Sequence, residues 1–201
     1  MLGAKISTFY ANIQHSWTNL VRMKIGLLRE GKIPIDRRVP LTPKQAVELQ
    51  ERFGVVVVAQ SSDIRAFSDS EYAKAGIEVV DSVDDCDVLL GVKEVPIQQL
   101  IPGKTYFFFS HTYKRQPYNA KLLKACVESN VRLIDYELLT KNGARVVAFG
   151  RFAGLVGAYN GLRGWGEKYG QYKLKPAHQC KDMEEMFAQL QGIEWPSDVR
   201  I

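Results

Sequence analysis

A regular alternation of short apolar runs and amphipathic segments is the feature that most constrains the fold of this chain. Continuous runs made mainly of apolar residues lie at residues 24–28, 55–59, 87–92, 105–110 and 131–136. Strands that are buried on both faces have this continuous apolar character, and helices that join parallel strands form right-handed crossovers. The pattern therefore predicts an α/β fold with a doubly wound, mostly parallel, Rossmann-like sheet and helices on both faces.

Residues typical of helix starts follow the first and the second apolar run. Thr42 and Gln45 have the spacing of a capping box, with a proline at the first helical position. Ser68 and Glu71 repeat this device, and Gly54 can end the first of the two helices. Helices are therefore expected to begin near residues 42 and 68.

Two further helices are predicted from the spacing of residues. Tyr118, Leu122 and Cys126 are spaced to bury one stripe of a helix over 117–129. Glycines recur in steps of four and three, at positions 150, 154, 157, 161 and 164. An interior glycine costs roughly 1 kcal/mol relative to alanine, so a helix here is expected to pack its glycine face against a neighbouring domain or a ligand. A glycine-rich loop is the alternative.

Composition and charge exclude several classes of protein. Hydrophobic residues make up 46% of the 201 residues and charged residues 24%, which is typical of a chain that buries a core rather than of a disordered one. A net charge of +5 is weak evidence for a nucleic-acid partner, and no apolar run approaches a membrane span in length. The three cysteines show no paired or metal-ligand spacing, so we expect no disulfide framework and no bound metal. A soluble protein without nucleic-acid or membrane partners is predicted.

Charged and polar residues follow several of the apolar runs, at positions that a parallel sheet brings to one edge. They are Arg29, Glu30, Lys93, Glu94, Ser110, His111 and, at the end of the last run, Asp135, Tyr136 and Glu137. Ligands of doubly wound sheets bind at the carboxyl ends of the strands. The grouping therefore predicts a binding or catalytic site at this edge.

The types of these residues indicate the chemistry. A lysine held near other cations can have a lowered pKa, and histidine titrates near neutrality, so the two can move protons at a carbon that bears nitrogen. The planar guanidinium group of arginine is suited to binding carboxylates, and Arg29, Arg38 and Arg145 are candidates for that role. An amino acid or a 2-oxo acid is the expected substrate. No strand is followed by a glycine-rich phosphate-binding turn.

Five segments of the chain carry a family resemblance. They are REGKIPIDRRVPLTP, GVKEVP, FFFSHTYK, RLIDYELL and GARVVAFGRFAGLVGAYNG, between about residues 24 and 170. In this order they resemble the N-terminal domain of the saccharopine dehydrogenase and lysine-ketoglutarate reductase group. That group is related more widely to alanine dehydrogenase and to the transhydrogenase N-terminal domain.

The resemblance implies an enzyme of two Rossmann-like domains, one that holds the amino-acid substrate and one that holds NAD or NADP. Saccharopine dehydrogenase oxidises the secondary amine of saccharopine to an imine, which is hydrolysed to lysine and 2-oxoglutarate. The resemblance assigns the acid–base pair to Lys93 and His111. The residues that it places beside this pair or near the substrate carboxylates are Arg29, Arg38, Glu94, Glu137 and Arg145.

The resemblance also implies domain boundaries. A substrate-binding α/β domain is expected at 23–150, a connector helix at 150–170, and a linker with the start of a truncated nucleotide-binding domain at 171–201. NAD or NADP is therefore expected in the full-length enzyme and is not expected to bind tightly to this chain. Residues 1–22 contain no acidic residue and are expected to lie outside the fold, as a mitochondrial presequence or as an extension before a natural start at Met23. The protein is expected in the cytoplasm, or in mitochondria if the extension is a presequence.

Two other functions stay open at this point. One is an enzyme similar to alanine dehydrogenase, and the other is a non-catalytic module that binds an amino acid or a 2-oxo acid. The direction of the lysine-pathway reaction and the choice between NAD and NADP stay open as well, because the residue that reads the ribose belongs to the nucleotide-binding domain.

Overall fold

The computed structural model describes residues 22–194, so residues 1–21 of the predicted extension lie outside the described residues. The described chain divides into two units, one up to Val146 and one from Val147. Each unit has its own hydrophobic core. Among the described helices, none combines the length and the apolar character that crossing a bilayer requires.

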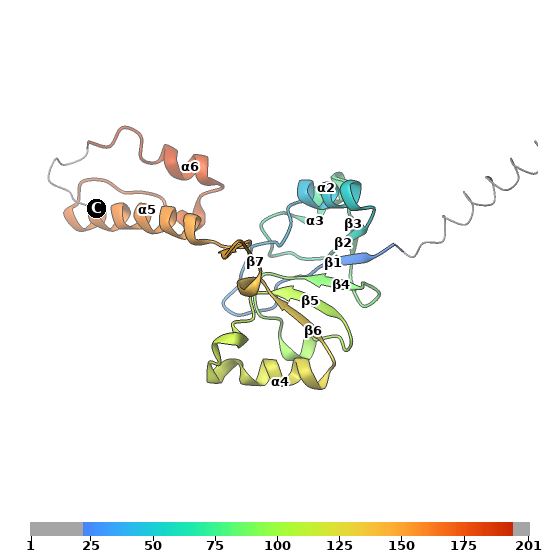
Figure 1. Cartoon of the computed structure of the whole chain (residues 1–201). Coiled ribbons are helices and arrows are strands. Elements are labelled where there is room, and N and C mark those ends of the chain that lie inside the picture. The colour runs from blue at the N-terminus through green and yellow to red at the C-terminus, as the bar shows by residue number, and fades with distance from the viewer. Residues whose placement is uncertain (1–21, 195–201) are drawn as a thin grey trace, which may run out of the picture. The chain divides into compact units, whose positions relative to one another are not determined.

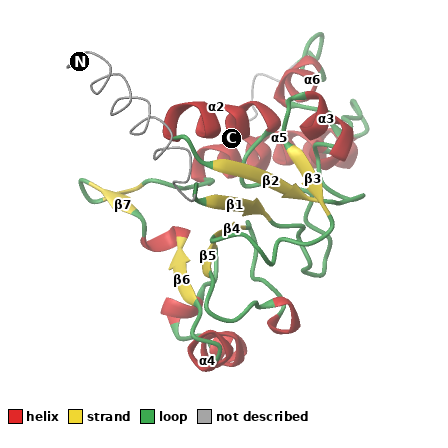
Figure 2. Cartoon of the chain, turned by 90° about the vertical axis from the view of Figure 1, so that its right-hand side faces the viewer, coloured by secondary structure: helices red, strands yellow, loops and turns green. Residues whose placement is uncertain are grey.

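A six-stranded parallel sheet forms the first unit. Its strands are β1 (Lys24–Leu27), β2 (Val56–Gln60), β3 (Glu78–Val80), β4 (Val88–Leu90), β5 (Thr105–Phe108) and β6 (Arg132–Asp135). They lie in the order β3-β2-β1-β4-β5-β6, as Figure 2 shows. β1 pairs with β2 on one side and with β4 on the other, so the direction of strand addition reverses at β1. This is the strand order of a doubly wound Rossmann fold, and it confirms the predicted fold class.

Helices cover both faces of this sheet (Figure 1). They are α2 (Pro43–Phe53), α3 (Asp69–Lys74) and α4 (Ala120–Glu128). Ala46 of α2 and Tyr72 of α3 join Leu27 of β1 in one buried cluster. Leu122 and Cys126 of α4 belong to a second buried cluster, against the other face. The sheet is therefore covered by a hydrophobic layer on each side, as its continuous apolar strands require.

Short elements connect the strands at the edge where the site lies. The single-turn 3-10 helices of this unit are η2 (Ile97–Gln99), η3 (Thr112–Lys114), η4 (Pro117–Asn119) and η5 (Tyr136–Leu138). A two-stranded antiparallel hairpin follows, made of β7 (Thr140–Lys141) and β8 (Ala144–Arg145).

Both predicted capping boxes form. Gln45 donates its backbone N–H to Thr42 Oγ1 at 3.3 Å, and the Gln45 side chain accepts the Thr42 amide at 3.0 Å. Ser68 and Glu71 make the same exchange at the start of α3. α2 ends at Gly54, which has the left-handed conformation with φ 65°. The predicted helix starts and the predicted stop are confirmed.

Two features of the first unit differ from the prediction. β3 is absent from the predicted strands, because it is three residues long, begins with a glutamate and lies at the edge of the sheet. Tyr118 is 66% exposed, so its predicted place in a buried helical stripe is wrong. The reason is that Pro117–Asn119 forms a 3-10 turn before α4 begins, and this changes the angular spacing of the side chains. Leu122 and Cys126 are buried as predicted.

The second unit is built on one long helix. Its elements are α5 (Gly150–Tyr169), the turn η6 (Ala177–Gln179) and α6 (Met183–Ala188). The glycine-striped segment is therefore a helix and not a loop. Tyr159 of α5 packs with Leu174 and Met186 in a small core, and its hydroxyl group donates to the Lys175 carbonyl at 2.6 Å.

The predicted glycine stripe of α5 is open in the described part of the chain. Apart from the glycine itself, its two chain neighbours and the backbone of the same helix, no described atom lies within 4 Å of the place where a Cβ would stand at positions 150, 154, 157, 161 and 164. The close approach occurs at Gly166 instead, where a Cβ would clash with the Tyr172 ring. Packing of the stripe against a neighbouring domain or a ligand stays a prediction.

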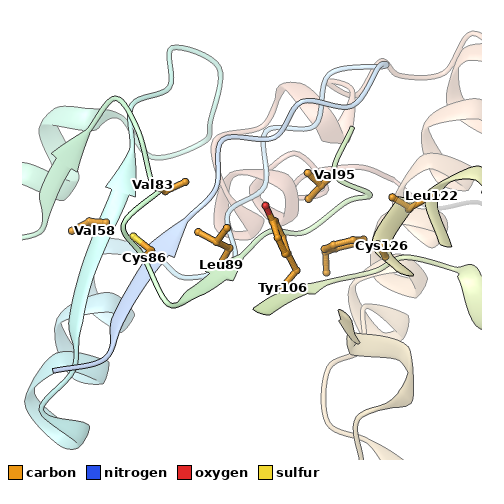
Figure 3. Close-up of a cluster of buried hydrophobic side chains, with 9 residues drawn as sticks. Val58, Val83, Cys86, Leu89, Val95, Tyr106, Leu122 and Cys126 are labelled. Atoms are coloured by element: carbon orange, nitrogen blue, oxygen red, sulfur yellow. The ribbon is translucent and has the colours of Figure 1, made fainter. Parts of the chain in front are cut away.

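The core next to the site depends on close packing at Gly26 of β1. Val83, Cys86 and Leu89 belong to the buried cluster that Figure 3 shows. A Cβ at Gly26 would stand 2.9 Å from Leu89 Cδ2 and 3.0 Å from Cys86 Sγ and Val83 Cγ1. Any side chain larger than a hydrogen atom therefore displaces part of this cluster.

Gly26→Ala is expected to lower the free energy of unfolding of the first unit by about 1–3 kcal/mol, because the methyl group overpacks a dense core. Gly161→Ala in α5 is the control, since open space surrounds that position. The control is expected to keep the free energy of unfolding or to raise it by up to about 1 kcal/mol. Urea unfolding followed by circular dichroism measures both. Equal stability of Gly26→Ala and the wild type would show that the core relaxes around the methyl group.

Candidate active site

A cavity of about 290 Å³ lies at the carboxyl ends of the central strands. Its lining includes Arg29 and Glu30 from the segment after β1, Lys93 and Glu94 from the segment after β4, and Gln60 at the end of β2. The order of strands reverses at β1, and the segments that leave β1 and β4 diverge at that point. The structure therefore places three of the candidate residues, Arg29, Lys93 and Glu94, on one cavity at the switch point of the sheet.

Glu30 connects the two segments that border this cavity. Its Oε1 accepts the Val92 amide at 2.7 Å, and its Oε2 accepts the Lys93 amide at 2.9 Å. Burial raises the pKa of Glu30, while the two amide hydrogen bonds act in the opposite direction. The position of Glu30 after the first apolar run indicates a site residue, but its contact with the backbone of Lys93 is not visible in the sequence.

Glu94 is a buried carboxylate with a cation beside it. The Lys32 ammonium lies 2.5 Å from Glu94 Oε2, and the glutamate side chain is 9% exposed. Lys32 comes from the segment after β1, so this ion pair also joins the segments after β1 and β4. Buried carboxylates need such partners, because an unpaired buried charge is costly.

His111 lies between two buried carboxylates. Its Nδ1 is 3.2 Å from Glu137 Oε2, and its Nε2 is 4.0 Å from Glu94 Oε1. The residue follows β5, has a left-handed backbone with φ 55°, and stacks its ring on Phe109. Since β4 and β5 are neighbouring strands, the segments that carry Lys93 and His111 leave the sheet side by side.

Three positively charged or protonatable groups surround the carboxylate of Glu137. Lys114 Nζ lies 3.0 Å and Arg145 Nη1 lies 3.5 Å from its Oε1, in addition to His111 on Oε2. Burial by itself raises the pKa of Glu137, but the hydrogen bonds from Lys114 and His111 outweigh it, and the pKa of this carboxyl lies below its usual range. The hydrogen bond to Glu137 in turn raises the pKa of Lys114.

Asp135 at the end of β6 orients the segments that carry His111 and Glu137. Its Oδ2 accepts the Ser110 hydroxyl at 2.5 Å and the Ser110 amide at 3.2 Å, and its Oδ1 accepts the Glu137 amide at 2.8 Å. The Ser110 hydroxyl in turn accepts the Thr112 amide at 3.1 Å. Asp135 therefore holds Ser110 directly, and Thr112 on the other side of His111 is held through the Ser110 hydroxyl.

The other two candidate arginines have different surroundings. Asp36 holds Arg38, with Nη2 to Oδ2 at 2.5 Å and Nε to Oδ1 at 2.9 Å. This pairing holds the pKa of Asp36 below its usual range. Arg29 lines the cavity, and its Nη1 donates to the Ser61 carbonyl at 3.3 Å.

Three partner residues lie outside the sequence-based set of site residues. They are Lys32 beside Glu94, Lys114 beside Glu137, and Asp36 beside Arg38. All three belong to the segments that carry the family resemblance. No local pattern identifies the first two, because their partners are 62 and 23 residues away along the chain.

The described residues form no cluster suited to a metal ion. No three histidine, cysteine, aspartate or glutamate side chains within residues 22–194 are grouped to hold one. Cys86 and Cys126 are buried, and burial raises the pKa of both thiols. They therefore act as small apolar side chains in the core.

Comparisons with known proteins show the family of this chain. The family model of the alanine dehydrogenase/PNT N-terminal domain matches residues 26–156. The chain is 42% identical to bovine mitochondrial alpha-aminoadipic semialdehyde synthase over 143 residues, which cover 71% of this chain and 15% of that protein. It is 37% identical to the Arabidopsis thaliana alpha-aminoadipic semialdehyde synthase over 150 residues, 72% of this chain and 14% of the relative. It is 32% identical to the NAD(+), L-lysine-forming saccharopine dehydrogenase of Yarrowia lipolytica over 149 residues, 71% of this chain and 40% of the relative.

Acid is expected to destabilise the first unit through Glu137. The folded state holds the pKa of this carboxyl below 4.5, its ordinary value, so its ionised form stabilises the fold above about pH 4.5 and this contribution is lost as the pH falls through the lowered pKa. Glu137→Gln is expected to lower the free energy of unfolding at pH 7 by about 1–3 kcal/mol and to flatten its pH dependence in acid.

The measurement is the urea midpoint as a function of pH for the wild type and the variant. Glu128→Gln is the control, because Glu128 forms an exposed i,i+4 pair with Lys124 on α4 and such pairs contribute little. The same acid dependence in the wild type and in Glu137→Gln would contradict the role of this carboxyl in stability.

Proposed function

Because the chain belongs to the alanine dehydrogenase/PNT N-terminal domain family, we propose that its first unit is the substrate-binding and acid–base domain of an oxidoreductase of lysine metabolism. The names of its relatives, alpha-aminoadipic semialdehyde synthase and saccharopine dehydrogenase, support this choice over an alanine dehydrogenase. The chain spans about 15% of the length of the bovine relative. The proposed reaction is therefore that of a longer enzyme of which this unit forms a part.

One observation carries the proposal: His111 lies between the buried carboxylates Glu94 and Glu137, and Glu94 lines the cavity together with Lys93. Cleavage or formation of a secondary amine needs a group that accepts a proton from nitrogen and a group that delivers one to the leaving amine. Lys93 and His111 are the proposed pair. Glu94 and Glu137 orient the imidazole ring through its two nitrogen atoms.

The proposed substrate carries carboxylates, and the arginines supply their binding groups. Arg145 Nη1 is 3.5 Å from Glu137, near the limit of a hydrogen bond, so a substrate carboxylate competes for this guanidinium group readily. Arg29 is exposed on the cavity and is a second binding group. Arg38 is held by Asp36 at two points, and its proposed contribution is the positive charge near Glu30 and the cavity.

The described residues do not fit a dinucleotide. Pyrophosphate binding in this fold needs glycines after the first strand and unoccupied amides at the start of the next helix. Here Thr42 Oγ1 occupies the Gln45 amide, Pro43 has no N–H group, and a Cβ at Gly31 would lie 2.8 Å from the Gln99 side chain. The name of the fungal relative contains NAD(+), and we propose that NAD or NADP is held by other parts of the longer enzyme.

Lys93→Met and His111→Gln are each expected to lower kcat by about 10²- to 10⁴-fold, because each removes one proton-transfer group. The protein to use is the complete product of the gene. One assay supplies saccharopine with NAD⁺ or NADP⁺, and a second supplies lysine and 2-oxoglutarate with the reduced cofactor. A third assay supplies alanine with the oxidised cofactor. Each variant is expected to lose one limb of the pH–rate profile. Lys121→Met on the exposed face of α4 is the control for loss of a lysine and is expected to behave as the wild type.

Wild-type rates and pH profiles in both variants would rule out the acid–base pair. Turnover of alanine without turnover of saccharopine would favour the alanine dehydrogenase alternative. Binding of an amino acid without turnover would favour the binding module.

Arg145→Ala is expected to raise the KM for a dicarboxylic substrate by a factor that corresponds to about 1.5–3 kcal/mol, the value of a lost hydrogen bond to a charged group. A monocarboxylic substrate is expected to lose less, because it has fewer carboxylates to place. Steady-state kinetics with the dicarboxylate 2-oxoglutarate and with the monocarboxylate pyruvate, in the wild type and in the variant, measure both effects. Arg132→Ala is the control, since this exposed arginine begins β6 at the opposite end of the strand. Equal losses for both substrates would indicate that Arg145 has a structural role.

A further inference from the structure

We infer that Glu30 is a positioning residue for Lys93 and that it acts through the backbone at the end of β4. The inference rests on the proposed function of Lys93. It adds to that function a carboxylate whose contacts are to two main-chain amides rather than to a substrate.

The two hydrogen bonds to Glu30 follow directly after the end of the hydrogen-bond ladder between β1 and β4. The ladder between β1 and β4 finishes where the Leu28 amide donates to the Leu90 carbonyl at 2.8 Å. Beyond that point the two segments separate, and the next amides of the β4 segment need other acceptors. Glu30 supplies both, with Oε1 on Val92 at 2.7 Å and Oε2 on Lys93 at 2.9 Å. One side chain therefore continues the pairing of the two central strands as far as Lys93.

β5 and the segment after it hold the same stretch from the opposite edge. The Gly91 amide donates to the Phe107 carbonyl at 2.9 Å, and the Phe109 amide donates to the Val92 carbonyl at 3.0 Å. The backbone that carries Lys93 is thus fixed on one edge by main-chain bonds and on the other by Glu30. Removal of the Glu30 carboxylate releases one edge and leaves β4 itself paired.

A carboxylate suits this position because it has two acceptor oxygens. The amide of a glutamine has one oxygen, and its NH2 group would face one of the two backbone N–H groups. Burial disfavours the charge of Glu30, and Arg38 favours it at longer range. Glu30 is partly buried, which is costly for a carboxylate. Its two oxygens accept the amides of Val92 and of the proposed proton-transfer residue, so its position points to a role in holding Lys93.

Glu30→Gln in the complete enzyme tests this role. A loss of positioning is expected to lower kcat about 10- to 100-fold, with KM for the amino-acid substrate changed by less than about twofold. The limb of the pH–rate profile that is lost in Lys93→Met is expected to shift. Glu30→Asp keeps both acceptor oxygens on a shorter arm and is expected to recover part of kcat. Gly26→Ala is the control for stability, because it perturbs the same strand and is expected to keep the wild-type pH profile.

Amide hydrogen exchange in the 201-residue chain tests the contact without any assay of activity. The amides of Val92 and Lys93 are expected to be protected in the wild type, and at least one of them is expected to exchange faster in Glu30→Gln. The Gly91 amide is expected to keep its protection, since Phe107 holds it.

The outcomes separate the two proposals. Faster exchange together with a lower kcat and a shifted limb supports the role of Glu30. Wild-type exchange, kcat and pH profile in Glu30→Gln, with turnover lost in Lys93→Met, would overturn the role of Glu30 and leave the proposed function standing. Wild-type turnover in Lys93→Met would overturn the proposed function, and the role of Glu30 with it.

Discussion

The parallel pairing of β1 with both β2 and β4 determines where every other part of the first unit lies. Because the order of strands reverses at β1, the segments after β1 and β4 leave the sheet in different directions and border a cavity between them. Gly26 allows this central strand to approach Leu89 and Cys86 closely. The same strand therefore sets both the packing of the core and the position of the candidate site.

Buried and partly buried carboxylates organise the site, and each of them does so through its hydrogen-bond and ion-pair partners. Glu30 accepts hydrogen bonds from two backbone amides, and Glu94 forms an ion pair with Lys32. Glu137 lies beside Lys114, His111 and Arg145. A carboxylate that is removed from water must be hydrogen-bonded or paired. Each carboxylate thus ties two segments that are distant in the sequence. The proposed acid–base residues lie among these segments.

The conformation of His111 shows how a strained residue is held at such a site. Its left-handed backbone, with φ 55°, is uncommon for a residue with a side chain. Ser110 and Thr112 on either side are linked through the Ser110 hydroxyl, and Asp135 binds that hydroxyl. The buried network keeps the turn in place, and the turn directs the imidazole ring between Glu94 and Glu137.

The sequence by itself determined the α/β class, five of the six described parallel strands, the two capping boxes and the candidate residues at the strand ends, because periodicity, capping and motif order are local properties. Other features of the first unit depend on its tertiary structure. β3 is too short for a periodic signal, and the turn at Pro117–Asn119 rotates Tyr118 out of the core. The contacts from Glu30 to Lys93 and from Lys32 to Glu94 join residues 63 and 62 positions apart. Such contacts form only after the sheet has brought the ends of its strands together, so no pattern along the chain can specify them.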